Sequence, residues 1–116
     1  MKTIFLAGSR TCSQELEQMF SLCKSAEIHA TKGRDSLNTA NEQEAHRTMM
    51  QRIDSADIVY VVASNGYVGK TVAFEIGYAA AKGKEIIASE PLAETGLNSV
   101  IAQILSSEQC IAYAKT

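Results

Sequence analysis

The fold is decided by a stretch in the middle of the chain, which reads Asp57-Ile58-Val59-Tyr60-Val61-Val62-Ala63. This stretch is rich in β-branched residues and nearly free of polar ones, which is typical of a strand buried on both faces of a sheet. A shorter apolar run over residues 4–7 ends at Gly8 and predicts a second strand of the same kind. Such strands belong to parallel sheets covered by helices, so the stretch indicates an α/β protein.

Strands and helices alternate on both sides of this central strand. The further predicted strands cover residues 28–31, 85–88 and 110–113. One helix follows a capping box formed by Thr11 and Gln14, and the others cover residues 71–81, 97–105 and a segment that ends at Ser55. That segment begins at one of two overlapping capping boxes, Thr39 with Glu42 or Asn41 with Glu44. The polar residues 32–38 are interpreted as a loop.

The alternation predicts a flavodoxin-like or Rossmann-like three-layer sandwich with a five-stranded parallel sheet in the order 2-1-3-4-5. A length of 116 residues suits a single domain that covers residues 1–116. In sheets of this kind, ligands bind beyond the carboxyl ends of the strands, where the strand order reverses. We therefore expect the loop that begins at Gly8 and the loop over residues 64–69 to lie at the same edge of the sheet.

Composition and charge exclude several classes of partner. The net charge is −2 and no cluster of Lys and Arg stands out, which argues against a nucleic-acid polymer. No apolar stretch approaches the roughly 20 residues that span a bilayer, so no membrane contact is predicted. Cys12, Cys23 and Cys110 lack the spacing of a metal site, as do His29 and His46, and no metal or cofactor is expected. Reduced thiols without a secretory signal favour the cytoplasm.

The tripeptide Gly8-Ser9-Arg10 joins the first strand to the first helix. Glycine allows close approach of a ligand, serine has a hydroxyl group, and arginine has a charged guanidinium group with several N–H donors. The start of the helix adds free backbone N–H groups. These features form a candidate phosphate site. The alternative is an ordinary turn with a solvated arginine.

The loop after the central strand continues as Gly66-Tyr67-Val68-Gly69-Lys70-Thr71. Gly-Lys-Thr before a helix resembles part of a P-loop, but the earlier glycine of that motif is replaced by Ser64. A nucleoside triphosphatase is therefore disfavoured. Gly66 and Gly69 remain candidates for contact with a ligand through their backbone N–H groups.

Glu75 follows in the early turns of the next helix, at the edge of an apolar stripe of Val72, Ile76 and Ala79. The start of a helix favours an ionised carboxylate, as a carboxylate nucleophile requires. The alternative interpretation is a surface glutamate at the edge of a buried face.

Three segments in this order resemble the nucleoside 2-deoxyribosyltransferase family, including its short members that are 2'-deoxynucleoside 5'-phosphate N-hydrolases. They cover residues 4–9, residues 53–59 and, most specifically, residues 69–79, which contain Phe74-Glu75-Ile76-Gly77-Tyr78-Ala79. The resemblance implies that Glu75 is a nucleophile that attacks C1' of the sugar. It also implies a nucleoside or nucleotide substrate and a homo-oligomer, a dimer or larger, in which Asn98 reaches a neighbouring site. The alanines at 79–81 offer a small-residue surface for such packing.

The sequence departs from the family pattern at three positions. Phe5 stands where the family usually has a tyrosine, and Met49 and Gly69 stand where it usually has aspartates. His46, one helical turn before Met49, is a candidate substitute. Two hypotheses follow: an enzyme that cleaves or transfers at the N-glycosidic bond of deoxynucleosides or their 5'-monophosphates, or a non-catalytic nucleotide-binding module of the same fold. The preferred base and the choice between water and a second base as acceptor stay open.

Overall fold

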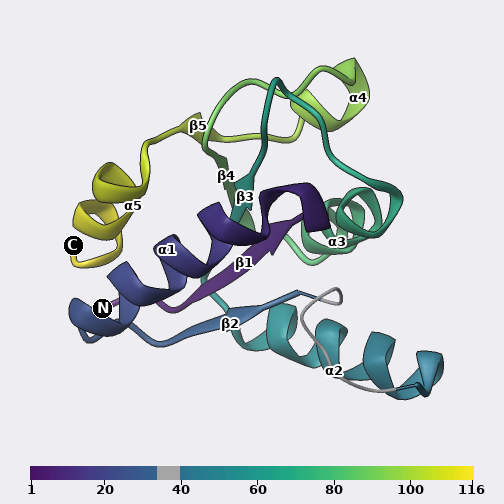
Figure 1. The fold of residues 1–116 in the computed structure, drawn as a ribbon, viewed down its shortest axis with the longest axis horizontal. Helices are drawn as coiled ribbons and strands as arrows, with labels where there is room; N and C mark the ends of the chain where they lie inside the picture. Colours follow the sequence, from purple (N-terminus) through teal and green to yellow (C-terminus); the bar gives the residue numbers. More distant parts are fainter. Residues whose placement is uncertain (34–39) are drawn as a thin grey trace.

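The computed structural model describes residues 1–33 and 40–116 as a sheet between two layers of helices (Figure 1). The strands are β1 (Ile4–Gly8), β2 (Ala30–Lys32), β3 (Ile58–Val62), β4 (Glu85–Ala88) and β5 (Gln103–Ile104). The helices are the short 3-10 turn η1 (Arg10–Cys12), α1 (Ser13–Ser25), α2 (Glu42–Ser55), α3 (Lys70–Ala81), α4 (Thr95–Asn98) and α5 (Ser107–Ala114).

The sheet has five parallel strands in the order β2-β1-β3-β4-β5, which confirms the predicted fold class and strand order. The longest pairing joins β1 to β3, from Ile4 beside Ile58 to Gly8 beside Val62. The order reverses between these two strands, because the chain turns from β1 toward β2 and from β3 toward β4. This is the switch point that the sequence predicts.

Both faces of the central strands are buried, and alternate residues belong to different cores. Phe5 and Ala7 of β1 pack with Val59 and Val61 of β3 under α2 and α3. The residues between them, Ile4 and Leu6 of β1 with Ile58, Tyr60 and Val62 of β3, pack under α1 and α5. Strands flanked by two helical layers need apolar side chains at every position, which explains the uninterrupted apolar runs.

The structure corrects two predictions near the carboxyl end of the chain. The predicted helix over 97–105 is wrong: the short α4 ends at Asn98, and β5 follows. Ile101 and Leu105 pack into the cores on opposite faces of the sheet, so their helical spacing misled the prediction. The predicted strand over 110–113 is also wrong, because this segment lies in α5. A capping box of Ser106 and Gln109, overlooked in the sequence, begins that helix.

The helix starts show which capping predictions were right. The side chain of Asn41 accepts the N–H of Glu44 at 3.0 Å, so the second of the two overlapping capping boxes marks the start of α2. Thr39 and most of the predicted loop over 32–38 lie outside the described residues. The capping role predicted for Thr11 is wrong, because Thr11 lies within η1 and its hydroxyl bonds with the hydroxyl of Ser9 at 2.8 Å.

Two aspartates fix the amino-terminal edge of the sheet. Asp57 accepts the N–H of Thr3 at 2.8 Å, and this hydrogen bond lowers the pKa of its carboxyl group. Asp54 accepts the hydroxyl of Tyr78 at 2.8 Å and thereby ties α2 to α3. Among the described helices, none has the length and apolar character needed to cross a membrane.

Candidate active site

The loops that follow β1 and β3 meet at the carboxyl edge of the sheet, as the sequence predicts. Gly8 and Val62, the last residues of the two strands, lie side by side in the parallel register. Gly69, directly before α3, lies so close to Ser9 that a Cβ atom on it would be 3.8 Å from the Ser9 Cβ. Gly8, Ser9 and Gly69 are therefore neighbours in space.

A pocket of about 250 Å³ opens beside the first of these loops, and we call it the carboxyl-end pocket. It lies between the start of α1 and the end of β2. Its lining consists of Gly8, Ser9, Arg10, Ser13, Leu16, Glu17, Lys32 and Gly33. The residues that the sequence predicts to bind phosphate thus line a pocket, together with a second cationic side chain, that of Lys32.

Different contacts hold the residues of this pocket in place. A Cβ on Gly8 would lie 2.9 Å from Leu16 Cδ1, so this glycine lets α1 pack closely on the strand end. Ser9 is 8% exposed, whereas the side chain of Arg10 reaches the surface. Lys32 Nζ lies 2.6 Å from Glu17 Oε1 and 4.6 Å from the centre of the Phe20 ring. An anion that enters the pocket therefore meets two cationic side chains, those of Arg10 and Lys32, and Lys32 is paired with Glu17.

Glu75 lies behind this pocket and is 1% exposed. It projects from α3 among the buried residues Val72, Ile76 and Ala79, so its carboxylate does not reach bulk water as a surface glutamate would. Burying a carboxylate is costly unless polar partners compensate, and such groups are frequent at functional sites.

Gly33 separates Glu75 from the carboxyl-end pocket. A Cβ on Gly33 would lie 2.5 Å from Oε2 and 2.9 Å from Oε1 of Glu75, distances at which atoms collide. The N–H of Gly33 donates to the carbonyl of Leu6 at 3.0 Å, and Arg52 Nη1 donates to the carbonyl of Lys32 at 2.9 Å. These two bonds fix the end of β2 against the carboxylate, and a side chain at position 33 would require the carboxylate to shift.

Gly66 and Asn98 do not line the carboxyl-end pocket, and each takes part in a hydrogen bond to a residue of the loop after β4. Gly66 has a φ of 75°, donates its N–H to Glu90 at 2.9 Å, and would place a Cβ 2.8 Å from the Ala93 nitrogen. Asn98 is exposed, and its Oδ1 accepts the N–H of Leu92 at 2.9 Å. Gly66 therefore holds the loop after β3 against the loop after β4, whereas the Asn98 bond lies within the segment that follows β4.

The positions at which the sequence departs from the family pattern are well defined. Phe5 and Met49 are both fully buried and belong to the same apolar core as Ile76. Gly69 precedes the first residue of α3 in extended backbone. His46 packs edge-on against Phe74, with ring centres 5.4 Å apart, and lies 3.7 Å from Glu42.

Lys32 and Gly33 were missed as site residues in the sequence. The signal that identifies them is the strand order: a central β1 is flanked by β2 on one side and β3 on the other, so the residues after β2 also lie at the carboxyl edge. In the described residues, no group of three or more His, Cys, Asp and Glu side chains is arranged to hold a metal ion.

Solved structures with this fold include enzymes of nucleoside metabolism. The chain is similar to a 2-deoxyribosyltransferase from Bacillus psychrosaccharolyticus, with a TM-score of 0.74, 14% identity, and coverage of 96% of this chain and 91% of that one. It is similar to a CMP N-glycosidase from Clostridium botulinum, with a TM-score of 0.61, 15% identity, and coverage of 97% and 98%. A conserved protein from Enterococcus faecalis V583 gives a TM-score of 0.71 at 15% identity, with coverage of 99% and 98%.

The fold and the edge site define an α/β protein with a pocket at the carboxyl edge of a parallel sheet, beside the ends of β1 and β2. The model of the family described as nucleoside 2-deoxyribosyltransferase matches residues 4–100, and the chain belongs to this family. Membership and fold indicate cleavage or transfer at an N-glycosidic bond. A comparison with curated proteins gives no match.

Because Gly33 contacts Glu75, substitutions at the two positions are expected to have coupled effects on stability. Gly33→Ala is expected to destabilise the protein by about 1–3 kcal/mol, because the methyl group overpacks against the carboxylate. In a Glu75→Ala background the same change is expected to cost at least about 1 kcal/mol less, because the obstructing atoms are gone. Denaturant unfolding of the four proteins in the cycle measures the difference.

Gly77→Ala serves as the control, since a Cβ at Gly77 meets nothing within 4 Å. It is expected to keep or raise stability in both backgrounds. Equal costs of Gly33→Ala with and without the Glu75 side chain would show that the two residues do not touch in solution.

Proposed function

We propose that the chain cleaves or transfers the N-glycosidic bond of 2'-deoxynucleosides or their 5'-monophosphates, with Glu75 as nucleophile. The observation that carries the proposal is the burial of Glu75 against Gly33, a residue that lines the carboxyl-end pocket. Buried carboxylates are frequent at functional sites, and we infer a role in chemistry for this one.

The proposed reaction has two steps. A Glu75 oxygen attacks C1' of the sugar, the bond between C1' and the base nitrogen breaks, and the base leaves with the electron pair and takes up a proton from water. Water or a second base then attacks C1', gives up a proton to water, and breaks the ester bond to Glu75, which returns as a carboxylate. A covalent ester divides one difficult substitution into two easier ones, as in retaining glycosidases.

Access to Glu75 is part of this proposal. Because the carboxylate is 1% exposed and lies against Gly33, attack on a sugar requires Gly33 to withdraw from it. Glycine has the widest range of backbone conformations, which suits a residue that must move. The 5'-phosphate is placed beside Ser9 and Arg10, which line the other side of the pocket.

A non-catalytic nucleotide-binding module is the second candidate. It is favoured by the full burial of Phe5 and Met49 in one apolar core, because both stand where the family usually has polar catalytic residues. The two candidates share the pocket and differ only in the use made of Glu75.

Glu75→Gln is expected to lower turnover roughly a thousandfold or more and to leave nucleotide affinity nearly unchanged, because the amide keeps the shape and removes the nucleophile. Chromatographic release of free base from each deoxynucleoside monophosphate measures turnover, and calorimetry measures affinity. Glu44→Gln, an exposed carboxylate on α2, is the control and is expected to retain full activity. Wild-type protein that binds nucleotides without releasing base would favour the non-catalytic candidate.

Deoxynucleoside 5'-monophosphates are expected to bind roughly tenfold more tightly than the free nucleosides, because Arg10 and the start of the first helical segment favour an anion. Arg10→Ala is expected to abolish this preference, whereas Arg47→Ala, an exposed arginine on α2, is expected to leave it. Titration calorimetry with matched nucleoside pairs gives both numbers. Equal affinities for the pair in the wild-type protein would contradict the phosphate site and favour a transferase of free nucleosides.

We further propose that the chain forms a homo-oligomer through the outer face of α3, so that Asn98 of one copy approaches the site of another. Phe74 is 49% exposed on that face, and Gly77, Ala80 and Ala81 beside it are also exposed. Ala79, which the sequence grouped with these alanines, faces the core instead. A helix face without acidic residues and with small side chains allows close packing of a second copy.

Gly77→Arg is expected to convert the oligomer to a monomer, because it places a charge in the contact, while a Cβ atom at this position meets nothing within 4 Å inside the chain. Gly77→Ala is the matched control and is expected to keep the wild-type assembly. Sedimentation at tens of micromolar, a rough range for a weak interface, measures the state. A monomeric wild-type protein at that concentration would contradict the proposal.

A further inference from the structure

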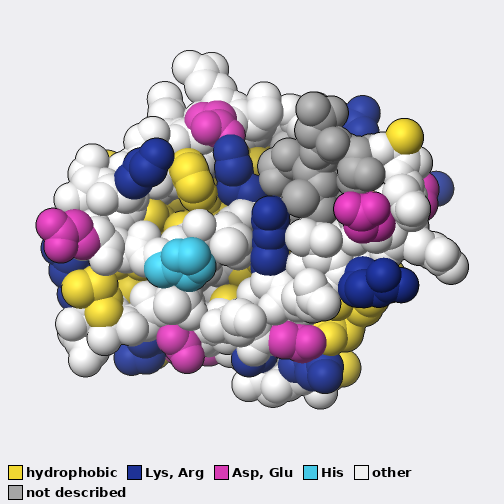
Figure 2. Space-filling model, turned by 90° about the horizontal axis from the view of Figure 1, so that it is seen from below, with side chains coloured by type: hydrophobic (Ala, Val, Ile, Leu, Met, Phe, Trp, Pro, Cys, Tyr) yellow, Lys and Arg dark blue, Asp and Glu magenta, His cyan; other side chains and the backbone are white. Residues whose placement is uncertain are grey.

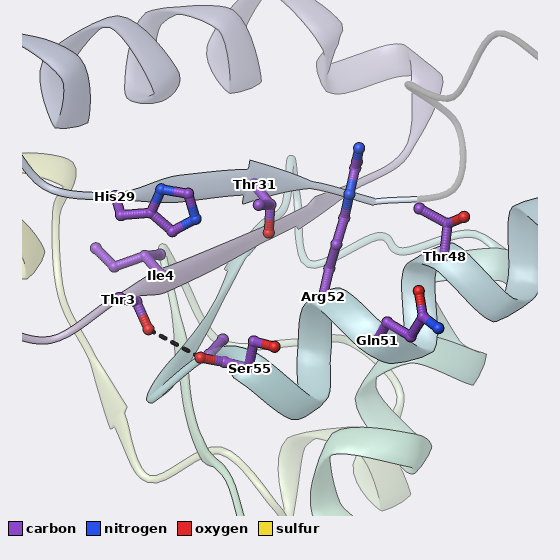
Figure 3. A pocket seen from close by; sticks show the side chains of 9 residues that line it. Thr3, Ile4, His29, Thr31, Thr48, Gln51, Arg52 and Ser55 are labelled. Atoms are coloured by element: carbon purple, nitrogen blue, oxygen red, sulfur yellow. Dashed lines mark hydrogen bonds between the residues drawn. The ribbon is translucent and has the colours of Figure 1, made fainter.

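A second pocket, of about 300 Å³, lies between α2 and strands β1 and β2, and we call it the α2–β2 pocket (Figure 3). Thr48, Gln51, Arg52 and Ser55 reach it from α2, and His29 and Thr31 reach it from the β2 segment. Thr3, Ile4 and Ala56 complete the lining. None of these residues lines the carboxyl-end pocket.

The lining is unusual for the space between a helix and a sheet, which is normally filled by apolar side chains. Here the α2 positions 48, 52 and 55 repeat at helical spacing and carry a hydroxyl, a guanidinium and a second hydroxyl. Facing them, Thr31 adds a further hydroxyl and His29 an imidazole (Figure 3). Among the residues that the structure describes, no acidic one lines the pocket, so its polar groups are mainly hydrogen-bond donors or groups able to donate.

Arg52 is the main charge in this pocket. It is half-buried, and its Nη1 donates to the carbonyl of Lys32 at 2.9 Å. In the described part of the chain, the ion pairs join Lys32 to Glu17, His46 to Glu42 and Lys82 to Asp54, and no carboxylate pairs with Arg52. A guanidinium has five N–H donors, and a partly buried cation is stabilised by an anion.

An acidic group lies beside one end of this pocket. Asp57 stands behind Thr3 at the end of the pocket that is formed by the start of β1, with its carboxylate 2.8 Å from the Thr3 nitrogen. The opposite end is that of Arg52, whose guanidinium reaches the end of β2. Figure 2 shows the face seen from below, where Lys and Arg side chains are spread across the surface with acidic side chains between them.

We propose that the α2–β2 pocket is a second binding site, for a small molecule that carries a phosphate or carboxylate group. Arg52 holds the anionic group, the hydroxyls of Thr48 and Thr31 donate to its remaining oxygens, and the rest of the ligand extends toward Thr3 and Ser55. The volume of about 300 Å³ fits a metabolite of the size of a sugar phosphate. This site is separate from the proposed catalytic site and does not depend on it.

The test uses the full chain with Arg10→Ala, so that the carboxyl-end pocket does not contribute to anion binding. Backbone amide shifts are followed during titration with inorganic phosphate, with ribose 5-phosphate and with malonate. The expected result is saturable binding of at least one probe, with the largest shifts at residues 29–31 and 48–55. Ribose 5-phosphate binding more tightly than phosphate identifies a sugar phosphate as the class of ligand, and malonate binding most tightly identifies a dicarboxylate.

Arg52→Met is expected to weaken the best probe roughly tenfold or more, and Arg47→Met, which removes an exposed arginine from the same helix, less than twofold. Because Arg52 also holds the end of β2, Thr48→Val is a second variant that keeps that bond and is expected to weaken binding several-fold. Absence of binding by all three probes at 20 mM, a rough upper limit for a specific site, would overturn the proposal. Equal losses in the two arginine variants would overturn it as well.

Discussion

The parallel pairing of β1 with β3 is the constraint on which the rest of the structure depends. It places five successive residues of one strand beside five of the other, and so fixes Gly8 beside Val62 at the carboxyl edge. The loops that leave the two strands turn to opposite helical layers, and the crevice between them is formed by topology before any particular side chain is considered. Ser9 and Gly69 are brought together by this pairing alone.

The parts of the fold that could be predicted from the sequence are those in which one local signal dominates. The buried strands β1 and β3 have uninterrupted apolar runs, and α2 begins at the capping asparagine Asn41. The carboxyl end failed because its signals conflict: Ile101 and Leu105 repeat as in a helix, although they pack on opposite faces of the sheet. A strand of two residues is too short to show any period, and β5 depends on its pairing with β4.

The candidate site also has residues that could be predicted from the sequence and residues that could not. Glu75 and the Gly8-Ser9-Arg10 turn are visible in the sequence because they follow recognisable strands or motifs. The role of Gly33 is not visible in the sequence, because it depends on a contact with Glu75, which is far away in the chain. The feature that matters in this contact is that Gly33 has no side chain. The contact of Gly66 with Glu90 and Ala93 is likewise long-range, and it gives this glycine a structural role in holding the two loops together.

One short segment of backbone connects the two pockets. Arg52 binds the carbonyl of Lys32, and the next residue, Gly33, touches the Glu75 carboxylate. A ligand that changes how strongly Arg52 holds that carbonyl therefore changes the free energy of every conformation in which Gly33 has moved. Thermodynamic linkage makes such an effect reciprocal: occupancy of either pocket alters the affinity of the other by the same factor. The bond from Arg52 to Lys32 and the contact of Gly33 with Glu75 thus form a direct physical connection between the two proposed sites.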